Sequence, residues 1–233
     1  MWDNHQTLDL LSNVLLVLAA LTAGYLVNQR VLNLPVFPLK EAHVGGSEAN
    51  GRLRHVTREQ IAGIVQSEVR GNFFTVDLEA VRNAFKKLPW VRIAAVRRVW
   101  PQGLEVTLEE HVALASWGSN ALVNVHGEVF NAAPDERLPL FEGPEGSSLE
   151  MARQHAVFNT LLEPLQQNIK EMNLSARRAW RLRLESGMVL ELGREQMEPR
   201  LERYVLVHGR SSAFLAQQLS YVDLRYPGGF AAR

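Results

Sequence analysis

The chain has 233 residues, enough for a membrane segment and one or two modest domains. Lys and Arg total 25, and Asp and Glu also total 25, so the chain lacks the basic excess typical of general nucleic-acid-binding proteins. Its hydrophobic fraction of 46% is ordinary for a globular protein, and the absence of cysteine excludes disulfides, thiolate catalysis and cysteine-bound metal sites.

A long uncharged stretch near the N-terminus runs from Leu10 to Val27. As a helix it would span about 27 Å, close to the roughly 30 Å hydrocarbon core of a bilayer. The residues before it contain no Lys or Arg, which a cleaved signal peptide would have there. We therefore predict an uncleaved transmembrane helix over residues 10–28, preceded by a short tail over residues 1–9. The charges that flank the helix leave its orientation in the membrane open, because the single Arg30 favours one orientation only weakly.

Residues 36–110 predict the order strand, helix, helix, strand, strand. The first strand is expected over residues 36–44, ending at Gly45-Gly46. The first helix is expected to begin at Thr57, where Gln60 three residues later completes a capping box.

The second helix is expected to begin at the N-cap Asp77 and to end before Pro89. A strand should follow over residues 90–100, with Ala94-Ala95 interrupting its alternation as a bulge might. The last strand has apolar residues at alternate positions, which gives it one buried face: Leu104, Val106 and Leu108. Two helices covering one face of a three-stranded sheet make a compact α+β module.

After Ala113 the chain turns mostly to strands. A hairpin is predicted over residues 122–130 with His126-Gly127 as its turn. Ser147 is expected to cap a helix, with Glu150 at the N3 position. A later strand alternates apolar residues with charged ones, and its apolar residues are Trp180, Leu182 and Leu184. A final amphipathic helix, marked by Leu201, Tyr204, Val205 and His208, precedes the C-terminal segment SYVDLRYPGGFAAR.

Catalytic patterns are absent from the sequence. The seven histidines show no ligand spacing, and no nucleophile-elbow, phosphate-loop or dinucleotide motif is present. Glu109 and Glu110 precede His111, but neighbouring strand residues point to opposite faces, so the two carboxylates would not share a site. We predict that the chain is not an enzyme and holds no cofactor or metal.

Four strings carry a resemblance to one known family. HVTREQIAGIV and LPWVRIAAVRRVWPQGLEVTLEEHV resemble the POTRA domain of FtsQ-type (FtsQ/DivIB) cell-division proteins, and NLSARRAWRLRLESGMVLELG and YVDLRYPGGFA resemble their C-terminal β domain. The resemblance implies an α+β chain with a single N-terminal transmembrane helix. It also implies a β-α-α-β-β POTRA domain over residues 36–111. A mostly antiparallel β domain with flanking helices would follow over residues 112–233.

The resemblance also implies a function. Such a protein is a division scaffold of the cell inner membrane, with its N-terminus cytoplasmic and its large domain periplasmic at the septum. It would link early and late divisome proteins, dock the periplasmic segments of FtsB and FtsL, and help control septal cell-wall assembly. No nucleic acid or small-molecule substrate is implied.

The expected docking site is the terminal strand. A strand at the chain end is a candidate sheet edge with unpaired backbone groups, which can accept a partner strand. Tyr226 is a hot-spot type of residue, Arg225 could pair with a partner carboxylate, and small glycines would let another backbone approach. By resemblance the partner-binding residues are Arg225, Tyr226, Gly228, Gly229 and Phe230.

Two other functions remain open on the residues alone. A POTRA-type periplasmic chaperone or secretion component would bind many extended client peptides weakly. A membrane-tethered hydrolase would need a nucleophile or metal constellation, which the sequence does not supply.

Overall fold

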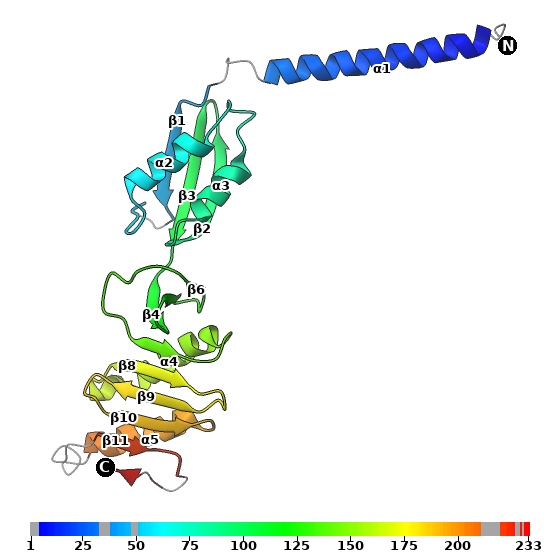
Figure 1. Cartoon of the computed structure of the whole chain (residues 1–233). Coiled ribbons are helices and arrows are strands. Elements are labelled where there is room, and N and C mark those ends of the chain that lie inside the picture. The colour runs from blue at the N-terminus through cyan, green and yellow to red at the C-terminus, as the bar shows by residue number, and fades with distance from the viewer. Residues whose placement is uncertain (1–4, 33–37, 48–50, 211–219, 227–228, 230) are drawn as a thin grey trace. The chain divides into compact units, whose positions relative to one another are not determined.

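The computed structural model describes residues 5–32, 38–47, 51–210, 220–226, 229 and 231–233. The chain divides into two compact units, Met1–Glu110 and His111–Arg233, each built around its own hydrophobic core (Figure 1).

The N-terminal helix α1 spans His5–Leu32. Its segment Asp9–Asn28 is long and apolar enough to cross a membrane, and none of that segment is buried inside the protein. In the described part of the chain it is the one helix that meets this test. Such a surface is stable in lipid and costly in water, so α1 has the properties of a membrane anchor.

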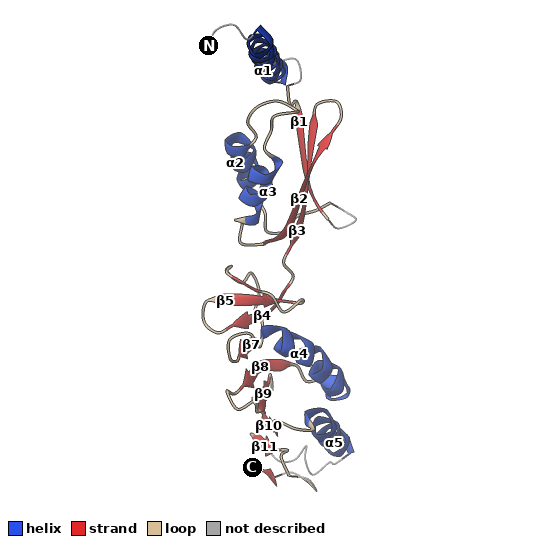
Figure 2. Ribbon diagram, turned by 90° about the vertical axis from the view of Figure 1, so that its right-hand side faces the viewer, coloured by secondary structure: helices blue, strands red, loops and turns tan. Residues whose placement is uncertain are grey.

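The first unit continues with a three-stranded sheet covered by two helices. Its elements are β1 (Glu41–Gly46), α2 (Arg58–Glu68), α3 (Leu78–Lys86), β2 (Val91–Val99) and β3 (Gly103–Glu110). The sheet order is β1-β3-β2, with β1 parallel and β2 antiparallel to the central β3. Both helices lie on one face of this sheet (Figure 2). The predicted order of elements is therefore confirmed.

Local sequence explains both helix starts. The Thr57 hydroxyl accepts a hydrogen bond from the Gln60 N–H, and the Gln60 side chain accepts one from the Thr57 N–H, so the predicted capping box is confirmed. Asp77 caps α3 by accepting from two backbone N–H groups. Val81 and Phe85 of α3 are fully buried against the inward-facing residues of β3, which are Leu104, Val106 and Leu108.

The first strand differs from its prediction. Val36 and Phe37 lie outside the described residues, Pro38 makes only an isolated bridge, and β1 begins at Glu41. The glycines expected to end the strand belong to it instead. A Cβ on Gly46 would lie 2.7 Å from the Arg52 carbonyl oxygen, so glycine is required by a close backbone approach.

The bulge in β2 was also placed wrongly. Ala94 and Ala95 pair regularly with Leu108 and Thr107 of β3. The irregularity lies earlier, between Val91 and Ile93. The two small residues Ala94 and Ala95 interrupt the apolar alternation in the sequence but not the pairing of β2 with β3.

The second unit is a nine-stranded mixed sheet in the order β12-β11-β10-β9-β8-β7-β4-β5-β6. Most neighbouring pairs are antiparallel, and the β4–β7, β7–β8 and β10–β11 pairs are parallel. Its elements are β4 (Ala113–Trp117), β5 (Ala121–Asn124), β6 (Val129–Phe130), β7 (Leu140–Glu142), α4 (Ser148–Leu162), the short 3-10 helix η1 (Glu163–Leu165), β8 (Ile169–Leu174), β9 (Trp180–Leu184), β10 (Val189–Gly193), α5 (Met197–Arg210), β11 (Tyr221–Asp223) and β12 (Ala231–Ala232).

Helices α4 and α5 cover one face of this sheet (Figure 2). The predicted alternation of β9 is confirmed, since its three apolar residues are buried and the arginines between them are exposed. Phe158 of α4 packs edge-on against Trp180, and Tyr204 of α5 is buried in the same core. The predicted β5–β6 hairpin is also confirmed, with Gly127 at φ +79 in its turn.

The cap predicted for α4 is only half right. Ser147 occupies the N-cap position, but its side chain makes no capping hydrogen bond. The hydroxyl donates instead to the Pro144 carbonyl oxygen. Glu150 pairs with Arg178 rather than completing a capping box.

Candidate functional site

One edge strand of the larger sheet is β12, at the C-terminal end of the described chain. It pairs with β11 in the register Val222↔Ala232 and Asp223↔Ala231, and its side chains are exposed. Within the described residues no strand covers its outer side. It is therefore an open sheet edge.

The ladder shows which backbone groups face outward. Arg233 donates its N–H to Tyr221 and accepts from the Tyr221 N–H. In an antiparallel pair the next residue along the strand directs its N–H and C=O the other way. Ala232 therefore presents both groups to the outside, where an added strand can pair with them.

The predicted terminal strand is in fact two short strands with an irregular segment between them. Arg225 and Tyr226 follow the end of β11 and belong to neither strand, and Gly229 precedes β12. Gly228 and Phe230 lie outside the described residues. Arg225 and Tyr226 thus lie between β11 and β12 in the chain and are not part of the ladder.

Arg225 is already engaged within the chain. Its Nε and terminal nitrogen donate to the two Asp223 carboxylate oxygens at 2.9 and 2.6 Å, and its backbone N–H donates to the same carboxylate. This pairing holds the pKa of the buried Asp223 below its usual range and raises the pKa of Arg225. The Arg225 guanidinium, which we expected to pair with a partner carboxylate, thus fixes the end of β11 through Asp223.

A glycine at the end of β10 gives the Arg225 stem its place. Gly193 has φ +77, and a Cβ there would lie 3.2 Å from the Arg225 Cγ and 2.9 Å from an Arg200 terminal nitrogen. That same Arg200 nitrogen donates to the Leu192 carbonyl oxygen at 2.6 Å. Close packing therefore connects β10, α5 and the segment after β11.

Tyr226 is 55% exposed, and the Arg203 guanidinium of α5 donates to its carbonyl oxygen at 3.5 Å. Leu206 and Val207 follow Arg203 at the i+3 and i+4 positions, so the three share one helix face, and both apolar side chains are exposed. Arg203 therefore connects Tyr226 to this face of α5.

Sequence reasoning missed the α5 contribution. The apolar pattern predicts the buried face of the helix, with Leu201 and Tyr204, but it does not explain the exposed Leu206 and Val207 on the opposite side. Two adjacent apolar residues on the wet side of an amphipathic helix were the available signal.

The carboxylates next to the edge are paired within the chain. Asp223 is neutralised by Arg225, and Glu191 is paired with Arg181. Arg233 stacks over the Tyr221 ring at 4.8 Å. Burial, with the nearby carboxylates of Glu191 and Asp223, raises the pKa of Tyr221, which keeps this phenol neutral.

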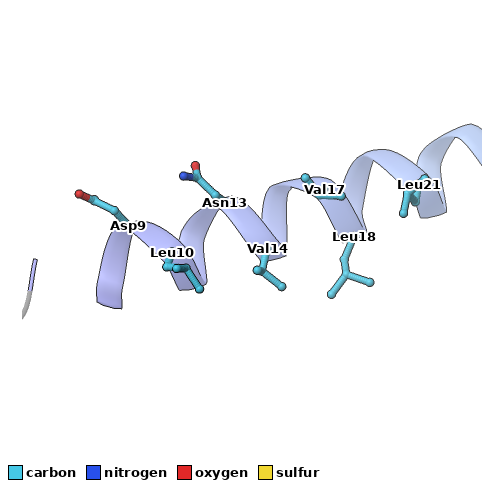
Figure 3. A pocket seen from close by; sticks show the side chains of 7 residues that line it. All are labelled: Asp9, Leu10, Asn13, Val14, Val17, Leu18 and Leu21. Atoms are coloured by element: carbon cyan, nitrogen blue, oxygen red, sulfur yellow. The ribbon is translucent and has the colours of Figure 1, made fainter. Parts of the chain in front are cut away.

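Two surface pockets elsewhere lack the features of a small-ligand site. One lies along the exposed side of α1, where Leu10, Val14 and Leu18 point to one side and Asp9 and Asn13 to the other (Figure 3). A second follows the β4–β5 turn, and none of its lining residues is titratable. Among the described residues no group of three or more His, Cys, Asp or Glu side chains could hold a metal ion.

Comparison with known proteins assigns both units. Residues 115–225 match the family model for the C-terminal domain of cell division protein FtsQ/DivIB, and residues 48–111 match the FtsQ-type POTRA domain. The chain is 58% identical to cell division protein FtsQ of Nitrosospira multiformis, over 100% of this chain and 99% of that protein. It is 39% identical to the protein of the same name from Burkholderia pseudomallei, over 100% and 94%. The identity to that of Neisseria gonorrhoeae is 33%, over 100% and 95%.

Proposed function

Since the chain belongs to the FtsQ/DivIB family of cell-division proteins, we propose that it is a membrane-anchored scaffold that docks the periplasmic segments of FtsB and FtsL at its β12 edge. Its action is binding without turnover. By bringing these partners to the division septum it links early and late division proteins and helps control septal cell-wall assembly.

The observation that carries the proposal is the outward-facing backbone of Ala232. An added strand gains main-chain hydrogen bonds from such an edge, and side chains beside the edge supply specificity. The small, exposed side chains of Ala231 and Ala232 leave room for that strand. Strand addition therefore suits this edge better than a flat side-chain contact.

The surroundings of the edge define the partner. Tyr226, Leu206 and Val207 offer exposed apolar side chains, and the Arg233 guanidinium over the Tyr221 ring offers positive charge. A matching partner segment is extended, acidic, and apolar at the positions that meet Tyr226. These are the features to look for in the FtsB segment.

The rest of the chain places this edge. In the proposal residues 1–9 are cytoplasmic, residues 10–28 anchor the chain in the inner membrane, residues 36–111 form the POTRA domain and residues 112–233 carry the docking edge. The two domains then lie in the periplasm, where they meet the periplasmic parts of other division proteins.

The test is a titration of the full chain, reconstituted in lipid nanodiscs, with the FtsB and FtsL periplasmic segments. Tyr226→Ala should weaken binding by about 2 kcal/mol, which is about a 30-fold rise in Kd. Val129→Ala is the matched control, since Val129 is an exposed apolar residue on β6, at the other edge of the same sheet. It should leave Kd unchanged.

Failure has distinct forms. Equal weakening by both substitutions would contradict docking at β12. No binding by folded wild-type chain would overturn the proposed partners. Comparable weak binding of many unrelated extended peptides would support the POTRA-type chaperone instead.

A further inference from the structure

Three exposed apolar side chains gather at one end of the POTRA domain: Phe74, Val99 and Trp100, which we call the aromatic end. Trp100 is 67% exposed and Phe74 is 44% exposed. Large aromatic side chains are normally kept from water, so such a grouping indicates a contact surface.

The aromatic end is held in a fixed shape. The Phe73 ring packs edge-on against both neighbours, with ring centroids 5.2 Å from Phe74 and 5.7 Å from Trp100. The Arg98 guanidinium donates to the carbonyl oxygens of Phe73, Phe74 and Val76. The loop before α3 is thereby tied to the end of β2, so the exposed rings are part of the folded domain.

This is also the end at which the chain enters the domain. Pro38 forms a bridge with Asn72, and the Lys40 N–H donates to the Gln102 carbonyl oxygen. Since α1 ends at Leu32, only residues 33–37 separate it from Pro38. Even fully extended, that connection spans only about 20 Å. The domain leaves from the opposite end of its sheet, through Glu110 at the end of β3.

From this juxtaposition we infer that the aromatic end contacts the interfacial layer of the membrane that α1 crosses. Trp is enriched at this layer because its ring is apolar and its N–H can reach water or headgroups. A connection of about 20 Å keeps Trp100 within reach of the headgroups once α1 is inserted.

The charges nearby suit a bilayer surface without requiring an anionic one. Arg97 is paired with Glu105, and the Arg98 guanidinium is bound by backbone carbonyl oxygens, while Lys40 is next in sequence to Glu41, whose carboxylate pairs with His43. The surplus of positive charge is small. Aromatic insertion therefore supplies most of the contact, and binding should depend only weakly on anionic lipid.

Spin labelling of the full chain tests the inference, because the chain has no cysteine of its own. Gln102→Cys places a nitroxide beside Trp100, and Ser47→Cys places one at the opposite end of the sheet, where the Ser47 N–H donates to Leu108. Leu18→Cys verifies that α1 lies in the bilayer. Each labelled chain is reconstituted in phosphatidylcholine vesicles, with or without phosphatidylglycerol.

We expect the nitroxide at position 102 to collide more often with oxygen than with a water-soluble nickel complex. The nitroxide at position 47 should show no such preference. Trp100→Ser combined with Phe74→Ser should abolish the preference at 102 while circular dichroism shows the chain folded. Equal exposure to nickel at 102 and 47, with Leu18→Cys buried in lipid, would overturn the inference. So would a preference at 102 that survives the double substitution. Neither outcome bears on docking at β12.

Discussion

Beside the proposed docking edge, three residues from two separate segments of the chain depend on one another. Gly193 leaves space for the Arg225 stem, Arg225 neutralises Asp223, and Asp223 is buried at the end of β11. A buried carboxylate without such a partner would be costly. The exposed Tyr226 follows directly after this cluster, so its position depends on it.

The first prediction concerns Gly193→Ala. A Cβ there meets Arg200 and Arg225 and also forces an L-residue to φ +77. Gly187→Ala is the matched control, because Gly187 has φ +90 with nothing within 4 Å. Both should lose about 1–2 kcal/mol of unfolding free energy from backbone strain. Only Gly193→Ala should also weaken partner binding, as measured by titration. Equal binding by the two variants would show that the Arg225 position is irrelevant to docking.

The second prediction concerns pH. Arg225 lowers the pKa of Asp223 below its unfolded value of about 4, so the pair stabilises the fold above pH 4. That stability is lost as the pH falls through the lowered pKa, because Asp223 is then protonated in the folded state too. The destabilisation caused by Asp223→Asn should therefore be full at pH 7 and smaller at pH 3, by urea unfolding. A penalty that does not change with pH would contradict the linkage.

Among the elements, the end of β3 holds the loop before α2. The Glu110 carboxylate accepts hydrogen bonds from the backbone N–H groups of Arg54, His55 and Val56 at 2.7–2.9 Å. Its neighbour Glu109 points to the other face and pairs with Arg92 at 2.6 Å. The expectation that these two carboxylates would not share a site is thus correct.

The third prediction compares these neighbours. Glu110→Ala leaves three N–H groups without their acceptor and should lower the free energy of unfolding by about 2–3 kcal/mol. Glu109→Ala removes a partly exposed ion pair and should cost at most about 1 kcal/mol. Urea unfolding followed by circular dichroism measures both. The reverse order would show that the carboxylate clamp adds little.

Elements were predictable where one local rule decided them. The capping box at Thr57, the Asp77 cap and the alternation in β3 and β9 each depend on residues a few positions apart. Errors arose where a competing contact overrides the local rule. Gly46 stays in the strand because the Arg52 backbone approaches it closely, and the Ser147 hydroxyl donates to the Pro144 carbonyl oxygen instead of capping the helix.

The candidate site divides in the same way. The sheet edge near the C-terminal end could be predicted, because a last strand is often an edge strand. Three other features could not be predicted: the Arg225–Asp223 pair, the space over Gly193 and the contribution of Arg203. They depend on how β10, α5 and the segment after β11 pack together.

For the whole molecule, the fourth prediction concerns orientation. With the large domains in the periplasm, a Ser47→Cys chain in intact cells should react with a maleimide that passes the outer but not the inner membrane. The unsubstituted chain, which has no cysteine, is the blank. Labelling only after the inner membrane is opened would place the domains in the cytoplasm and remove the proposed periplasmic docking.

The most direct test of docking by strand addition is titration of Ala232→Pro with the FtsB and FtsL segments. Proline is tolerated at an edge where the N–H faces outward, and it removes that one donor. Ala232→Ser keeps the N–H and is the matched control. The account predicts that the proline variant stays folded by circular dichroism and loses at least about tenfold in affinity, about 1.4 kcal/mol, while the serine variant binds like wild type. Undiminished binding by a folded Ala232→Pro chain would contradict backbone pairing at β12.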